Sequence, residues 1–156
     1  MTTKFNDALT RHGTVEFERT FAASVERVYA ALANAKARAD WSAPTDSAIL
    51  VYDEEDFRIG GRDVFRCGAK DDPRFRGVTR YLDIVDNRRI VTSEVVDEAG
   101  ALLGASLVTV ELEPEGSGTK LRLTAQVASF GGEGMIEGTK QGYTGSLANL
   151  ERYLAS

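Results

Sequence analysis

The chain has 156 residues, of which 42% are hydrophobic and 28% are charged, and this length and composition predict one globular domain with its own core. The formal net charge of −5 argues against sequence-independent nucleic-acid binding, which needs a basic surface. A single cysteine, Cys67, excludes an intrachain disulfide and favours the reducing cytoplasm. No apolar run is long enough to span a membrane, and the amino terminus lacks the apolar segment of a secretion signal.

The first elements are expected in the order strand, helix, helix. Residues 1–13 are polar and aperiodic, which predicts a flexible tail. In the stretch 14–21, TVEFERTF, apolar and polar side chains alternate as they do in a half-buried strand. Ser24 is a good N-cap for an amphipathic helix over 24–34, and a second short helical piece ends at Trp41.

Six further strands are expected between the second helix and residue 129. Runs rich in strand-forming residues are separated there by turn-forming pieces such as IGG, KDDP and EPEGSG. Links this short favour antiparallel hairpins, because a parallel crossover needs a dozen residues or more. The expected strands are 46–52, 61–67, 75–85, 89–97, 104–113 and 119–129.

A long helix is predicted from residue 132 to the C-terminus. Its apolar stripe runs from Ile136 to Leu154 at helical spacing. Four glycines between residues 134 and 145 line another side, and each costs a helix about 0.8–1 kcal/mol relative to alanine. Two interpretations stay open. Either the helix begins only near Thr139 and the first two glycines belong to a loop, or the smooth backbone face admits a ligand or a close neighbour.

Two hairpins have a register that can be read from the sequence. In the last one, Leu112 is expected opposite Leu121, with Glu111 beside Arg122 on the wet face. A tight turn at residues 86–88 gives the earlier hairpin, RGVTRYLDIVDNRRIVTSEVV, a register in which residues facing each other sum to 174.

That earlier hairpin places Arg80 opposite Glu94 on a face otherwise made of apolar side chains. A charge on such a face must be paired or hydrated. Three interpretations stay open: a one-residue register shift that turns both charges outward, a structural ion pair near the open end of the sheet, or a polar anchor for a ligand inside a cavity.

Four segments, in order, carry a family resemblance: FERTFAASVERVYAALANAKARADW, DFRIGGRDVFR, FRGVTRYLDIVDNRRIVTSE and GYTGSLANLERYL. Through them the chain, from about residue 14 to 155, resembles the START-like (SRPBCC) helix-grip superfamily, and most closely the branch named for the activator of heat shock protein 90 ATPase. The resemblance implies an α+β, Bet v-like fold and a single domain over 14–156. A curved seven-stranded antiparallel sheet would wrap around the long C-terminal helix, with two short helices after the first strand. One departure is Gly142-Tyr143, where relatives usually carry Gly-Trp.

This resemblance favours non-catalytic binding of a small hydrophobic or amphipathic molecule between sheet and helix. The candidate ligand-binding residues are Trp41, Phe65, Val78, Arg80, Leu82, Glu94, Val108, Leu123, Met135, Thr139 and Tyr143. Two alternatives stay open. One is a co-chaperone-like module that contacts a chaperone ATPase. The other is a polyketide cyclase- or aromatase-like enzyme that uses Glu94 or Tyr143 as an acid or base.

The sequence offers no catalytic constellation, and neither a cofactor nor a metal is expected. His12 is the only histidine and falls in the predicted tail, so a histidine-based triad or an imidazole metal cluster has no partner in the core. The acidic run at 53–56 is interpreted as a solvated loop and Cys67 as a small buried side chain. The sequence leaves both a monomer and a homodimer open.

Overall fold

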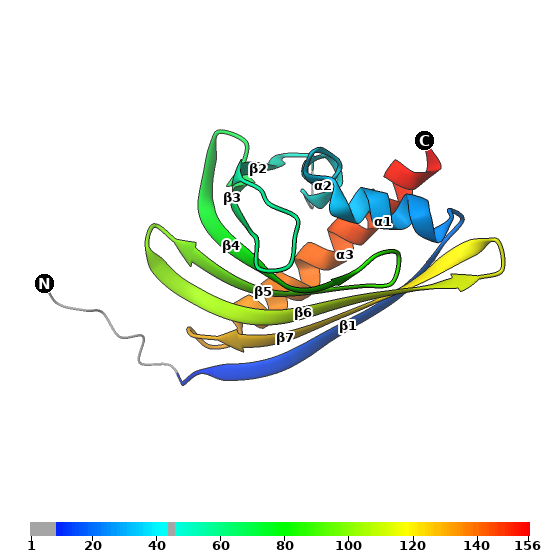
Figure 1. The fold of residues 1–156 in the computed structure, drawn as a ribbon. Coiled ribbons are helices and arrows are strands. Elements are labelled where there is room, and N and C mark those ends of the chain that lie inside the picture. The colour runs from blue at the N-terminus through cyan, green and yellow to red at the C-terminus, as the bar shows by residue number, and fades with distance from the viewer. Residues whose placement is uncertain (1–8, 44–45) are drawn as a thin grey trace, which may run out of the picture.

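The computed structural model describes residues 9–43 and 46–156, and within them seven strands form one curved antiparallel sheet with three helices on its concave side (Figure 1). The strand order is β1-β7-β6-β5-β4-β3-β2, so the first strand pairs with the last. This architecture confirms the predicted helix-grip fold. The elements are β1 (Arg11–Phe21), α1 (Val25–Ala33), α2 (Ala35–Ser42), β2 (Ala48–Glu54), β3 (Arg62–Ala69), β4 (Asp72–Val85), β5 (Arg89–Glu98), β6 (Ala101–Glu115), β7 (Gly118–Ser129) and α3 (Gly134–Ala155).

Strand β1 begins at Arg11, three residues before the expected start at Thr14. Arg11 pairs with Ser129, and the ladder with β7 continues to Phe21. His12 is therefore an exposed strand residue and not part of a tail, because its backbone belongs to a paired ladder. Residues 1–8 of the predicted tail lie outside the described residues.

The two short helices are separated by a single capping residue, Asn34. It ends α1 and is the N-cap of α2, where its side-chain Oδ1 accepts a hydrogen bond of 2.9 Å from the backbone N–H of Ala37 in the first turn. Helix α1 is capped by Ser24 as predicted, with Oγ accepting from the N–H of Arg27 at 3.2 Å. The indole N–H of Trp41 donates to the carbonyl of Ala31 at 3.0 Å and so ties the end of α2 back to α1.

Helix α3 lies across the concave face of the sheet, with α1 beside its C-terminal half (Figure 1). It begins at Gly134, so the interpretation that placed the helix start near Thr139 is wrong. Leu147, Leu150 and Leu154 are buried in the core. The N-terminal half carries no fully buried side chain, which leaves the helix less tightly packed there.

The β6–β7 register confirms the prediction. Leu112 lies opposite Leu121 and Glu111 opposite Arg122. The β4–β5 hairpin agrees with the prediction only near its turn, where Ile84 pairs with Ile90.

A β-bulge at Leu82 shifts the rest of the β4–β5 ladder by one residue, so Arg80 pairs with Ser93 and Glu94 pairs with Thr79. The predicted Arg80–Glu94 pair is therefore wrong. Because the extra residue sits on β4 alone, it turns Arg80 outward and leaves Glu94 on the concave face.

Gly77 on β4 sets the position of the Phe65 ring on β3, its partner in the ladder. A Cβ atom at Gly77 would overlap that ring. We expect Gly77→Ala to lower the free energy of unfolding by about 1–3 kcal/mol through overpacking, as measured by urea denaturation. Gly134→Ala is the control, since a Cβ there meets nothing within 4 Å and should not lower the free energy of unfolding. An unchanged midpoint in Gly77→Ala would contradict this packing.

Candidate functional site

A cavity of about 420 Å³ lies between the concave face of the sheet and helix α3. Its sheet wall is largely apolar and includes Phe65, Val96, Val108, Val110, Leu121 and Leu123. Its helix wall is made by Met135, Gly138, Thr139, Gly142, Tyr143, Ser146 and Leu147. Trp41, Ser42 and Ala43 close one end, where the hydroxyl of Ser146 donates to the carbonyl of Ser42 at 2.6 Å.

The structure brings most of the sequence-predicted site residues to this cavity. Those that line it are Trp41, Phe65, Glu94, Val108, Leu123, Met135, Thr139 and Tyr143. Val78, Arg80 and Leu82 do not line it. For these three positions the prediction is wrong, and the bulge explains why. The β4 residues that reach the cavity are Phe75, Thr79 and Tyr81, while Arg80 is exposed and Leu82 is 49% exposed.

A polar row crosses the sheet wall of the cavity. The register places Asp63, Thr79, Glu94 and Ser106 side by side on β3, β4, β5 and β6. All four line the cavity. Adjacent strands are about 4.8 Å apart, so the backbones at Asp63 and Glu94, two strands apart, are separated by roughly 10 Å. The row therefore holds two carboxyl groups in separate environments.

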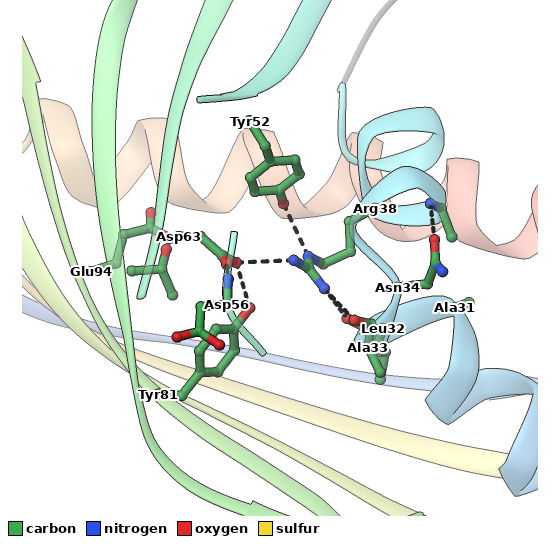
Figure 2. Close-up of polar contacts among 12 residues, drawn as sticks. Ala31, Leu32, Ala33, Asn34, Arg38, Tyr52, Asp56, Asp63, Tyr81 and Glu94 are labelled. Carbon is green, nitrogen blue, oxygen red and sulfur yellow. Dashed lines mark hydrogen bonds and ion pairs between the residues drawn. The ribbon is translucent and has the colours of Figure 1, made fainter. Parts of the chain in front are cut away.

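The first carboxyl group, Asp63, belongs to a buried ion pair with Arg38 of α2 (Figure 2). The Nη2 of Arg38 lies 3.0 Å from Oδ2 of Asp63, and the two side chains are only 10% and 3% exposed. The hydroxyl of Tyr81 also donates to Oδ2, and the N–H of Asp56 donates to Oδ1 at 3.1 Å. Every oxygen of this carboxylate is thus occupied by the protein.

The guanidinium of Arg38 is similarly occupied. Its Nη1 donates to the carbonyls of Leu32 and Ala33 at 3.0 and 2.8 Å, and its Nε donates to the hydroxyl of Tyr52 at 3.1 Å. Arg38 therefore joins the end of α1 to β2 and β3 through one side chain (Figure 2). A buried charge held this way is compensated by its own partners.

The second carboxyl group, Glu94, has much less support. Its Oε2 accepts a hydrogen bond of 3.3 Å from the hydroxyl of Thr79, and no cation within the described ranges pairs with it. Figure 2 shows Glu94 beyond Asp63, on the side away from Arg38. Burial raises the pKa of the Glu94 carboxyl, and the hydrogen bond from Thr79 opposes that rise only in part.

Tyr143 of α3 brings a second unsupported polar group to the cavity. No hydrogen bond to its hydroxyl is formed by any residue that the structure describes, while its ring makes an edge contact with Phe17 at a centroid distance of 6.3 Å. Burial, followed by the charge of Glu94, raises the pKa of Tyr143. The phenol therefore stays protonated and can donate to a bound molecule or accept from it.

Sequence reasoning missed Arg38, Tyr52, Asp63 and Tyr81. A signal for Asp63 was present, because it alternates in phase with Phe65 and Cys67 on β3 and so shares their face. Arg38 gave no comparable signal, since its partners lie on α1, β2 and β3 and depend on tertiary packing.

Metal binding and thiol chemistry have little support in the described part of the chain. No three metal-ligating residues come together there. Cys67 is half-buried on the cavity wall, and burial raises the pKa of its thiol, which makes it a weak nucleophile. No helix in 9–43 and 46–156 is long and apolar enough to cross a membrane.

Comparison with known proteins gives both a family match and structural matches. The model of the family described as Activator of Hsp90 ATPase homolog 1-like protein matches residues 22–155. A solved structure of an uncharacterised protein from Rhizobium leguminosarum is 30% identical, with a TM-score of 0.81, over 94% of this chain and 97% of that one. The Mll3558 protein from Rhizobium loti is 36% identical, with a TM-score of 0.78, over 93% and 99% of the two chains. The comparison with curated proteins gave no match.

Asp63→Asn should be strongly destabilising, because it leaves the charge of Arg38 buried without its counter-ion. We expect a loss of about 3–5 kcal/mol in the free energy of unfolding, measured by chemical denaturation. Asp53→Asn is the matched control. Asp53 pairs with Arg66 at 2.9 Å, but these side chains are 41% and 45% exposed, so the loss should be far smaller than in Asp63→Asn. Equal losses in the two variants would contradict the buried pair.

Glu94→Gln should stabilise the unliganded protein at neutral pH and leave it little changed in acid. The folded-state pKa of Glu94 is raised, so the wild type loses stability as pH rises from the ordinary glutamate pKa through the raised folded value. The variant cannot ionise at this position and escapes that loss. Melting temperatures across this range, with Glu111→Gln on the exposed face as control, measure the effect. A constant difference at all pH values would exclude ionisation of Glu94 as its source.

Proposed function

Since the chain belongs to the family of Activator of Hsp90 ATPase homolog 1-like proteins and has a START-like helix-grip fold, we propose that it is a receptor for a small amphipathic molecule. The molecule is held between the sheet and α3. The observation that carries this proposal is the cavity of about 420 Å³ itself, which lies inside the range of small-molecule sites and combines apolar walls with few polar groups.

Two glycines of α3 leave part of the helix wall of the cavity without side chains, which is consistent with a binding site. Gly138 and Gly142 line it, and a Cβ at either position would meet nothing within 4 Å. Alanine would be tolerated sterically at both positions and would favour the helix by about 0.8–1 kcal/mol each. The glycines therefore forgo helix stability while leaving the wall smooth where a ligand would lie against it.

The two ends of the proposed ligand meet different surroundings. Its apolar body packs against Phe65, Val108 and Leu123 on the sheet and Met135 on the helix. Burying such a body contributes roughly 25 cal/mol for each Å² of apolar surface removed from water. Its polar end lies at Glu94 and Tyr143, two titratable groups of the cavity that the described residues leave without full partners.

The cytoplasm is the proposed compartment. Cys67 borders the cavity as a free thiol, and a reducing compartment would keep it in that form. Fractionation of cells that express the tagged protein tests this assignment.

Substituting Gly142 by leucine should abolish or weaken ligand binding, because the new side chain would occupy the cavity. Titration with the neutral fluorophore N-phenyl-1-naphthylamine should show saturable binding to the wild type, and Gly142→Leu should weaken it by about tenfold or more, or about 1.4 kcal/mol. Gly134→Leu is the matched control, since Gly134 is on the same helix with open space around it but does not line the cavity. Absence of saturable binding to the wild type, or equal loss in both variants, would contradict the proposed function.

A further inference from the structure

The polar groups of the cavity differ in whether the protein already uses them. Besides Glu94, the titratable side chains that line it are Arg38, Tyr52, Asp63, Cys67, Tyr81 and Tyr143. Arg38 is the only cation among these cavity-lining residues, and its charge is balanced by Asp63 at 3.0 Å. Four of its hydrogen bonds go to protein acceptors, and it is 8% exposed. A bound anion would therefore find no available positive charge in the cavity.

Glu94 supplies an acceptor that is still free. Its Oε2 has the bond from Thr79, but no donor among the described residues reaches Oε1. Glu94 is flanked on β4 and β6 by Thr79 and Ser106, which are neutral. Its carboxyl can accept a hydrogen bond in either protonation state, through the carbonyl oxygen when neutral or either oxygen when ionised.

Tyr143 stands on the opposite wall and is electrostatically coupled to Glu94, whose charge contributes to raising its pKa. Its hydroxyl has no protein partner in the described ranges and can either accept or donate. A ligand hydroxyl or amine between the two walls could donate to Glu94 and also bond to Tyr143. A ligand carboxylate could accept from Tyr143, but it would lie beside a second carboxyl group.

Ligands that end in a carboxylate should bind more weakly than those that end in an amine or a hydroxyl. Burying an anion without a cationic partner is unfavourable, and a nearby like charge adds to that cost. A hydrogen bond to a charged group is stronger than one between neutral groups. An ammonium group would also neutralise the one carboxylate of the cavity that lacks a cation.

We propose, building on the receptor function above, that the cavity selects amphipathic molecules whose polar end is a hydrogen-bond donor, a primary amine or a hydroxyl, and rejects those that end in a carboxylate. The juxtaposition that carries this inference is Glu94 on the sheet wall and Tyr143 on the helix wall of one cavity. Among the described residues Glu94 has no cationic partner, the hydroxyl of Tyr143 has no hydrogen bond, and the one cation that lines the cavity is bound to Asp63.

Three isosteric probes with one aromatic body test the selection by calorimetric titration: 1-naphthylmethylamine, 1-naphthalenemethanol and 1-naphthoate. The wild type should bind the amine and the alcohol at least about tenfold more tightly than naphthoate. Glu94→Gln should weaken amine binding by about tenfold, leave the alcohol within about threefold because the amide oxygen still accepts, and strengthen naphthoate binding. Glu111→Gln removes the same charge from an exposed position and should leave all three affinities unchanged.

The outcomes separate the two proposals. Naphthoate binding as tightly as the amine and the alcohol, or a preference for the amine that survives Glu94→Gln, would overturn the selection by Glu94 while the receptor function stands. Failure of all three probes to bind the wild type would overturn the receptor function and this inference with it.

Discussion

The structure depends on the ion pair between Arg38 and Asp63, because this contact joins the helical layer to the far edge of the sheet. The pair is 3.0 Å long, nearly inaccessible to water and completed by Tyr81 and Tyr52. Breaking such a pair is costly, because removing either partner leaves the other charged, buried and without a counter-ion. The end of the cavity nearest Trp41 is shaped by this constraint.

A second constraint is the space between the concave face of the sheet and helix α3, which the helix fills only in part. A curved sheet of seven strands presents a wide concave face, and α3 is the only helix that crosses it in the described structure. Its C-terminal half fills the space with Leu147, Leu150 and Leu154. In its N-terminal half, Gly138 and Gly142 line the cavity and place no side chain in it. One helix thus serves as a core element along half its length and as a cavity wall along the other half.

Stability and recognition make opposite demands on the polar row that crosses the sheet. Asp63 is fully partnered and contributes to holding the elements together, whereas Glu94, two strands away, has one weak hydrogen bond and a raised pKa. A site that recognises a ligand needs groups that the protein itself does not satisfy, and such groups reduce the stability of the unliganded fold. The contrast between these two carboxyl groups is the physical basis for the proposal that Glu94 contacts a ligand, while Asp63 holds elements of the fold together.

The sequence by itself determined the order of the elements, the antiparallel sheet, the capped α1 and the β6–β7 register, because each follows from local periodicity, short turns or side-chain capping. It also identified Glu94 as a charge on the apolar face and Tyr143 as a departure within the last helix. Only the tertiary structure decided that Arg80 faces outward, since one extra residue at Leu82 changes the phase of a single strand without altering the composition of the hairpin. The Arg38–Asp63 pair also required the fold, because residues 25 positions apart meet there through the docking of α2 on β3. Periodicity reports which face a residue shares with its neighbours, but bulges and docking between elements decide what that face meets.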